Sequence, residues 1–324
     1  MLGKKQVSKL LLKALLFLLI LFFLDYTIGG ILRELYFTQD SGYLYRTTYA
    51  MDSTRADILI FGSSTANHHY YPDAFEKRLK MSCYNTGRDG NSIFYHYAVL
   101  ESVLERYHPK IIILDFNLGE FKNASGSYDR ISSLLPYCKK HPELDSIVKL
   151  KGPYEKYKML SKVYPFNSLI FSILIGNLDY NRERKYMDDN QGYVPLTKIW
   201  DHKIAIDTTV KSYEIDTNMI QTFKDFINSN INSKVKLYIV ISPGFFKYTK
   251  KEPSIEIAHR IANEYSIPFF DFSRDTFFWN NPRLFSNENH LNDSGAKVFS
   301  NKVIDSIILH EESVNEKRTD PKEK

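Results

Sequence analysis

Two residues of this chain have side chains that could together perform acyl chemistry. Ser64 follows the apolar run 57–61, and a serine in such a position can serve as a nucleophile. His290 lies in the polar segment 285–292 just before an expected helix, where an imidazole can act as a general base. The pair could cleave or transfer an ester if the fold brings the two side chains within hydrogen-bond distance.

Two further segments offer donors for the oxyanion that such a reaction creates. Gly87 and Gly90 lie three residues apart after the apolar run 81–84, a spacing that allows a tight turn with exposed backbone N–H groups. Asn117 follows the run 111–116, and a carboxamide can donate to an oxyanion. Each of the four segments alone also fits an ordinary turn, so the hypothesis rests on their combination.

The elements that would position these residues alternate along the chain. Five short apolar runs are expected as strands: 57–61, 81–84, 111–116, 235–241 and 268–272. Helical patterns are expected between and after them: 72–80, 92–107, 213–230, 254–265 and 294–309. This alternation predicts an α/β domain over residues 56–310 with a doubly wound, mostly parallel five-stranded sheet. Ligands meet such sheets at the carboxyl ends of the strands, where the polar segments lie.

Two stretches depart from the alternation. Residues 118–232 are rich in Tyr and Lys, and a structureless loop of that length is improbable, so we expect a helical insertion that caps one edge of the sheet. Its aromatic residues could stack on sugar rings or pack in a core: Tyr154, Tyr157, Tyr164 and Phe166. Residues 311–324 are charged and lack apolar anchors, which predicts a disordered tail.

The N-terminal segment has the pattern of a membrane anchor. Residues 14–24 are wholly apolar, and 14–32 would span about 28 Å as a helix, enough to cross a bilayer core. Lysines precede the run (Lys4, Lys5, Lys9 and Lys13), which places the N-terminus in the cytoplasm and the main domain outside it. We therefore expect a signal anchor over residues 1–32 and a connector over 33–55. A cleaved signal peptide is the alternative.

Composition excludes several classes of protein. With 43% hydrophobic and 25% charged residues the chain is globular, not wholly disordered. The formal net charge of +5 is concentrated in the N-terminal lysines, so no nucleic-acid partner is expected. Two cysteines, Cys83 and Cys138, exclude a disulfide scaffold and form no metal-binding pattern, and neither a metal nor a cofactor is expected.

Two other polar segments are expected to be structural. His68 and His69 follow the serine turn and are expected at the surface, although they could line the site or bind a metal. Ser242-Pro243-Gly244 ends the fourth strand and reads as a turn that could also shape the pocket.

The four polar segments together resemble the SGNH (GDSL-like) serine hydrolases, named for Ser, Gly, Asn and His in four blocks. The resemblance covers roughly residues 56–118 and 235–305. It implies Ser64 as nucleophile and His290 as base, with Asn287 at the position of the family's aspartate. It also implies an oxyanion hole made by Ser64, Gly90 and Asn117, and no metal or cofactor.

The chain departs from the family pattern at three places. Ser63 replaces the Asp of the first block, as in a divergent branch that includes membrane-anchored envelope proteins. Asn117 lacks the usual Gly-x-Asn-Asp context. Asn287 replaces a carboxylate, and an amide there can favour the wrong histidine tautomer. Three outcomes are open: a backbone carbonyl orients His290, Glu288 or Asp293 supplies the charge, or the site is slow or inactive.

The resemblance implies an extracytoplasmic esterase or acyltransferase held in the inner membrane by a single pass. Its expected substrates are acyl esters, expected to be acetyl, of cell-envelope polysaccharide, and its expected partner is a membrane-bound O-acyltransferase. Two other functions stay open. One is an esterase for soluble small acyl esters, and the other is a non-catalytic envelope scaffold or glycan-binding module that keeps the fold.

Overall fold

A computed structural model of the chain describes residues 3–178, 190–202, 205–207, 213–248 and 252–319. Its centre is a five-stranded sheet in the order β2-β1-β3-β5-β7, in which every neighbouring pair is parallel. The strand bounds are β1 Ile58–Gly62, β2 Cys83–Asn85, β3 Ile111–Asp115, β5 Lys236–Ile241 and β7 Phe269–Asp271. The predicted α/β fold with a five-stranded parallel sheet is confirmed. A separate parallel pair, β4 Ala205–Asp207 and β6 Phe246–Tyr248, was not predicted.

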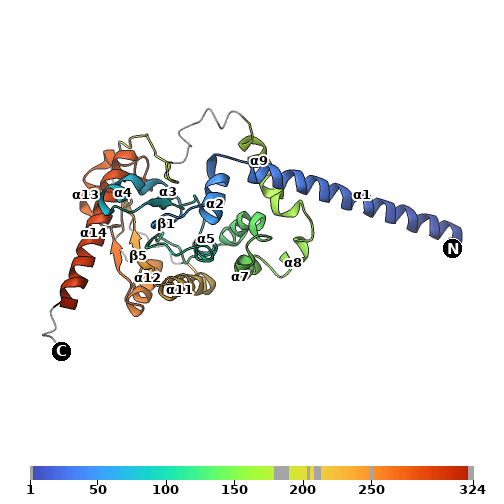
Figure 1. Ribbon diagram of the computed structural model, residues 1–324. Helices are drawn as coiled ribbons and strands as arrows, with labels where there is room; N and C mark the ends of the chain where they lie inside the picture. The colour runs from blue at the N-terminus through green and yellow to red at the C-terminus, as the bar shows by residue number, and fades with distance from the viewer. Residues whose placement is uncertain (1–2, 179–189, 203–204, 208–212, 249–251, 320–324) are drawn as a thin grey trace.

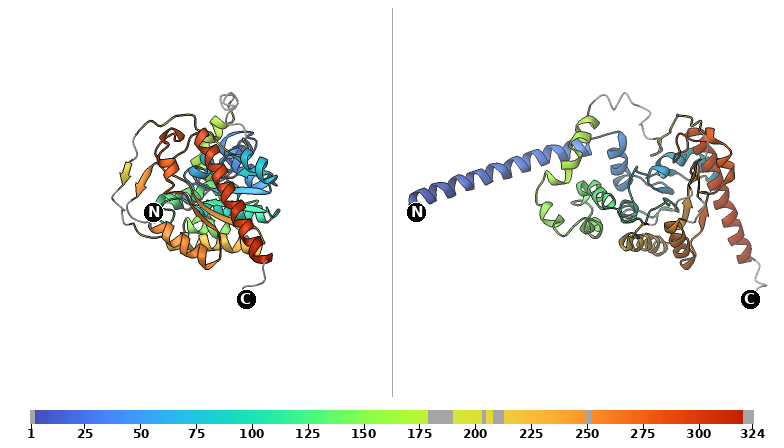
Figure 2. Two further views of the ribbon diagram at one scale, coloured as in Figure 1. Left: turned by 90° about the vertical axis from the view of Figure 1, so that its left-hand side faces the viewer. Right: turned by 180° about the vertical axis from the view of Figure 1, so that it is seen from behind.

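Helices cover both faces of the sheet because the central strands are apolar on both sides (Figure 1 and Figure 2). Leu59 and Leu114 face one core with helices α5, α11 and α12, whereas Ile58 and Ile113 face the other with α3, α4 and α14. The helix bounds are α3 Ser64–His69, α4 Pro72–Leu79, α5 Ile93–Leu104, α11 Thr217–Asn232, α12 Pro253–Glu264 and α14 Asp293–Thr319. Short turns of helix, α13 Thr276–Trp279 and η5 Pro282–Leu284, precede α14.

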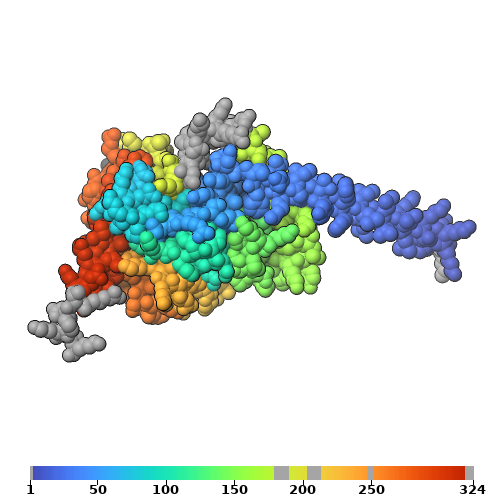
Figure 3. Space-filling model, viewed as in Figure 1, coloured from blue at the N-terminus to red at the C-terminus, as the bar shows by residue number. Residues whose placement is uncertain are grey.

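Helix α1, Lys4–Phe37, projects from the body as a straight rod (Figure 3). Its residues 4–24 are exposed, and the helix is long and apolar enough to cross a membrane. One such helix near the N-terminus is compatible with a single-pass anchor. The connector expected after it is largely helical, since α1 runs on to Phe37 and α2 covers Gly42–Asp52.

The last turns of α1 are held against the insertion by hydrogen bonds and close packing. The Asp25 carboxylate accepts hydrogen bonds from Ser161 Oγ at 2.5 Å and from the Lys162 backbone N–H at 2.8 Å. Gly29 permits the close approach, since a Cβ there would lie 2.4 Å from backbone and side-chain atoms of Lys162. The one acidic residue in the apolar run is therefore a docking residue.

The insertion begins with short helices that pack on α1, α2 and α5, not on a sheet edge (Figure 2). Their bounds are α6 Ser125–Arg130, η1 Ile131–Tyr137, η2 Pro142–Leu144, α7 Asp145–Leu150, α8 Glu155–Lys158, η3 Tyr164–Leu169 and α9 Ile170–Gly176. A non-helical part, residues 190–200, covers the free edge of β2, where the Asn85 N–H donates to the Gln191 carbonyl at 2.7 Å. Residues 179–189 lie outside the described part of the chain.

The prediction of a disordered tail is wrong for residues 311–319, which continue α14. Glu311 accepts hydrogen bonds from Lys236 and from the hydroxyl of Tyr238, so a charged residue does anchor this part of the helix. A helix already nucleated by the apolar stretch before it extends into charged sequence at little cost. Residues 320–324 lie outside the described residues.

Candidate active site

Ser64 lies where β1 turns into α3, as the first residue of that helix. The turn depends on Gly62, whose φ of +146° disfavours other residues and whose Cβ would meet Ala66 Cβ at 2.7 Å and the Asp115 carbonyl at 2.8 Å. The tight turn places Ser64 at the carboxyl end of the sheet. Its backbone N–H is among the first of the helix, which have no acceptor within the helix.

His290 reaches Ser64 from the loop before α14. Its Nε2 lies 2.8 Å from Ser64 Oγ, the distance at which an imidazole can take the proton of the hydroxyl. The loop is held from both sides: the Ser286 N–H donates to the His290 carbonyl at 2.8 Å, and the Leu291 N–H donates to His69 Nε2 at 2.9 Å. The two residues predicted as nucleophile and base therefore lie in one site.

Asn287 fixes the tautomer of His290. Its side-chain oxygen accepts the backbone N–H groups of Asn289 at 2.9 Å and of His290 at 3.0 Å, so the atom in this position must be oxygen. The same oxygen lies 3.0 Å from His290 Nδ1, which therefore carries the proton. Nε2 is left unprotonated and faces Ser64, as a general base requires.

Protonation of His290 is less favoured than protonation of the histidine in a Ser-His-Asp triad. Burial and the neighbouring His68 lower the pKa of His290, and Asp89 offsets only part of this decrease. Neither Glu288 nor Asp293 contacts the imidazole in the described part of the chain. Asp293 instead accepts from Tyr193 at 3.1 Å and pairs with Lys297 at 2.6 Å. The amide orients the imidazole without supplying a negative charge.

The oxyanion side is occupied by the protein's own hydrogen bonds. Gly90, with φ of +69°, donates its N–H to Ser63 Oγ at 3.1 Å. Asn117 Oδ1 accepts from Thr65 Oγ1 at 2.9 Å, and the Asn117 side chain also hydrogen-bonds Glu120. An amide nitrogen carries two hydrogens, so one remains for a substrate.

Two buried carboxyls below the site escaped the sequence analysis. Asp115, the only charged residue of β3, accepts from Tyr70 at 2.8 Å and from Ser242 at 2.6 Å, and burial raises its pKa to about 6. Burial also raises the pKa of Glu120 to about 7, and this carboxyl caps α5 by accepting the Ile93 N–H at 2.6 Å. An acid inside an otherwise apolar strand was the available signal for Asp115. The serine of Ser242-Pro243-Gly244 thus supports the strand ends.

The adjacent histidines are buried, so the expectation that they lie at the surface is wrong. His69 lies beneath the base, and its ring is 6.0 Å from that of His290. His68 lies 5.4 Å from the His290 ring, with Nε2 3.4 Å from Asp89 Oδ2. Burial opposes ionisation of Asp89, but hydrogen bonds from His68 and Asn67 hold its pKa down at about 2. Sequence alone gave no reason to link Asp89 to the base.

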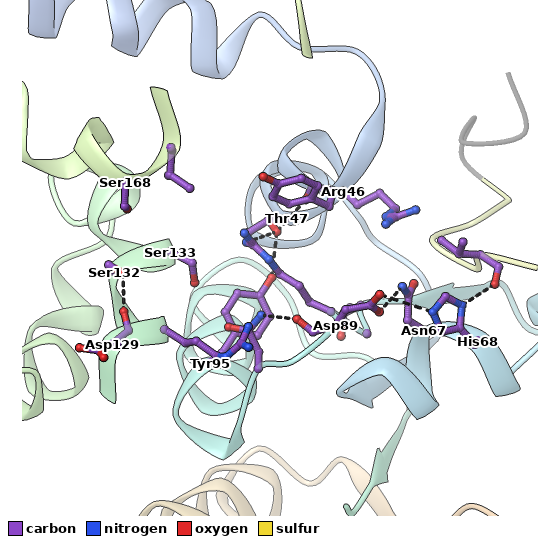
Figure 4. A pocket seen from close by; sticks show the side chains of 18 residues that line it. Arg46, Thr47, Asn67, His68, Asp89, Tyr95, Asp129, Ser132, Ser133 and Ser168 are labelled. Atoms are coloured by element: carbon purple, nitrogen blue, oxygen red, sulfur yellow. Dashed lines mark hydrogen bonds and ion pairs between the residues drawn. The ribbon is translucent and has the colours of Figure 1, made fainter. Parts of the chain in front are cut away.

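Ser64 and His290 open into a cavity of about 380 Å³, which Gly90 and Asn117 also line. A second cavity of about 520 Å³ adjoins it, and Asn67, His68 and Asp89 form one of its walls (Figure 4). Within the described residues, no group of three or more His, Cys, Asp and Glu is arranged to hold a metal ion. Cys83 and Cys138 are free thiols.

No protein-family model and no curated protein matches the chain. The resemblance to the SGNH hydrolases therefore stays a prediction, and the functional argument rests on the geometry of the site.

Proposed function

We propose that this protein is a serine esterase or acyltransferase. The observation that carries the proposal is the contact of 2.8 Å between Ser64 Oγ and an unprotonated His290 Nε2. Asn287 supports it, because its oxygen holds the proton of the imidazole on Nδ1. A serine hydroxyl is a weak nucleophile until a base takes its proton, and this arrangement provides that base.

The reaction follows from these contacts. Ser64 Oγ attacks the ester carbonyl while His290 Nε2 takes the hydroxyl proton, which forms a tetrahedral oxyanion. The N–H groups of Ser64 and Gly90 and the amide of Asn117 stabilise that charge, and Ser63 Oγ gives up its bond to Gly90. His290 then protonates the leaving alkoxide, and Ser64 keeps the acyl group. Water or a sugar hydroxyl, deprotonated by His290, releases it.

The substrate proposal rests on the resemblance and on the N-terminal helix. We place the domain outside the cytoplasm, tethered to the inner membrane by α1, where acyl esters of envelope polysaccharide are the substrates. A membrane-bound O-acyltransferase would be the partner that supplies or receives acyl groups. Tethering supports this assignment because it raises the effective concentration of the enzyme near a membrane-linked substrate.

A fluorophosphonate probe tests the chemistry on the full chain in detergent micelles. We expect the probe to label the wild type, and Ser64→Ala to abolish labelling. His290→Ala should slow labelling by about 10³-fold or more, since the two residues act as a unit. Ser127→Ala is the matched control, because Ser127 lines the same cavity and should label normally. Wild-type labelling no faster than that of Ser64→Ala would overturn the proposal.

One alternative has a specific observation in its favour. Among the described residues no carboxylate is bonded to His290, and the Gly90 N–H is hydrogen-bonded to Ser63. Both features would suit a module that binds acylated glycan without cleaving it. Under this alternative the wild type binds an acetylated polysaccharide tightly, resists the probe and releases no acetate over hours. Under the enzymatic proposal, acetate release accompanies binding and disappears in Ser64→Ala.

A further inference from the structure

The second cavity lies between four parts of the fold. Figure 4 shows Arg46 and Thr47 of α2 on one side, Ser132, Ser133 and Ser168 of the insertion on another, and Asp89 with His68 on a third. Tyr95 of α5 completes its lining. Asn91 lines both this cavity and the one that holds Ser64, so the two spaces are neighbours.

The buried cation Arg88 lines this cavity. Arg88 is only 9% exposed, and its Nη1 donates to Thr47 Oγ1 at 2.7 Å. Its guanidinium lies over the rings of Tyr43 and Tyr95, at 5.1 and 5.3 Å from their centroids. Over the ranges that the structure describes, no carboxylate forms an ion pair with it. Burial of a cation without a counter-ion is costly, which indicates that an anion completes the site.

A second guanidinium lies at the boundary with the catalytic cavity. A Cβ built on Gly90 would lie 2.5 Å from Arg130 Nη1, so Arg130 covers the glycine whose N–H is assigned to the oxyanion hole. Arg130 is exposed and can turn toward a ligand in either cavity. Two acidic residues, Asp89 and Asp129, also line the second cavity. Asp89 accepts a hydrogen bond from Asn67 at 2.7 Å and lies beside His68, and Asp129 is exposed to solvent.

Two buried amide oxygens add acceptors to the same wall. Asn67 Oδ1 and Asn91 Oδ1 have no hydrogen-bond partner in the described structure, although the residues are only 2% and 7% exposed. A buried acceptor without a partner is rare in folded proteins and is normally satisfied by a ligand or by water. Both oxygens are closed off from the cavity, so each side chain must turn before it can accept a hydroxyl group of a sugar.

We propose that this cavity is a subsite for an anionic sugar unit. Arg88 and Arg130 bind its carboxylate, sulfate or phosphate. The amides of Asn67 and Asn91, which line the same cavity, turn toward the ligand and accept its hydroxyl groups. The neighbouring unit of the same glycan then presents its ester to Ser64. Only this last step rests on the proposed esterase function, since binding of the anion needs no catalysis.

Calorimetry on the full-length Ser64→Ala protein in detergent micelles tests the subsite without turnover. The probes are a tetramer of glucuronic acid and a tetramer of glucose. We expect the acidic tetramer to bind about tenfold more tightly or better, and Arg130→Gln to remove most of that difference, as expected for loss of one charge-assisted bond. Arg260→Gln on α12 is the matched control and should change neither affinity.

Arg88→Met should weaken binding of the acidic tetramer further. If this buried variant fails to fold, Arg130→Gln still tests the subsite, because Arg130 is exposed. Competition by inorganic phosphate or by sulfate, compared at equal concentration, identifies which anion the site prefers. Equal affinity for both tetramers, or an unchanged preference in Arg130→Gln, would overturn the subsite. Labelling of Ser64 by fluorophosphonate is measured separately, so the esterase and the subsite can fail independently.

Discussion

The two sides of the candidate site differ in how ready they are for reaction. On the base side, Ser64, His290 and Asn287 already have the distances and the tautomer that proton transfer needs. On the oxyanion side, the Gly90 N–H is bonded to Ser63 and the Asn117 amide to Thr65 and Glu120. The base side already has the geometry for proton transfer, whereas on the oxyanion side the Gly90 N–H must first give up its hydrogen bond to Ser63.

The difference shows where the chain departs from a charged triad. Ser63 and Asn287 are both neutral, and the predicted resemblance to the SGNH hydrolases would align each of them with an aspartate. One substitution supplies the hydroxyl that binds Gly90, and the other leaves the imidazolium without a fixed negative charge. The first affects access to the oxyanion hole and the second affects the strength of the base, so substitutions can test the two separately.

Among the substitutions that test this comparison, the largest effect is expected for Asn287→Asp. A carboxylate would keep the bond to Nδ1 and stabilise the imidazolium, so kcat for ester hydrolysis at pH 8 should rise by about tenfold or more. The added charge should also raise the pKa of His290, which moves the acid limb of the kcat/KM profile to higher pH.

Asn289→Asp is its matched control, since it adds the same charge on the same loop without a bond to the imidazole. A comparable gain in Asn289→Asp would show that general electrostatics, not the contact with Nδ1, limits the base. A loss of activity in Asn287→Asp would mean that the base side depends on the amide.

A smaller gain is expected for Ser63→Ala, which frees the Gly90 N–H for the oxyanion. The bond that no longer has to break corresponds to about 1 kcal/mol, or roughly fivefold in kcat. Steady-state hydrolysis of p-nitrophenyl acetate by the full chain measures it, with Ser127→Ala as the control on the same cavity. A fall in kcat would show that the Ser63 hydroxyl itself takes part.

The smallest effect is expected for Asp89→Asn. Since His290 must be unprotonated to act, kcat/KM falls as the pH drops through its pKa, and this midpoint should lie below 6.5 in the wild type. Asp89 raises that pKa, so its removal should move the midpoint lower by roughly a few tenths of a unit. A midpoint above 6.5 in the wild type would contradict the burial of the base.

Much of the fold could be predicted because its signals are local. The buried strands are nearly continuous apolar runs, and the bounds observed for β1 and β3 differ from the expected ones by at most one residue at each end. The insertion could not be predicted in detail, since its short helices are stabilised by packing on α1, α2 and α5 and not by their own sequence pattern. The length of α14 was missed because Glu311 finds its partners on a distant strand.

The site was predictable to the extent that strand ends converge in a parallel sheet. Ser64, Gly90, Asn117 and His290 line one cavity, although more than two hundred residues separate the first from the last. The tautomer of His290 was not predictable, because it depends on two backbone N–H groups that hold the Asn287 amide. Asp89 and the buried histidines act through space, and no spacing in the sequence records such contacts.

The hydrogen bonds that Asp25 accepts from the insertion connect helix α1 and the α/β domain into one rigid unit. A flexible linker in its place would let the α/β domain move through a large volume above a bilayer. If α1 spans a bilayer, this rigid connection keeps the candidate site at one height and one tilt above the lipid surface. Which units of a polymer are modified would then depend on their distance from the membrane and not on their position along the polymer chain.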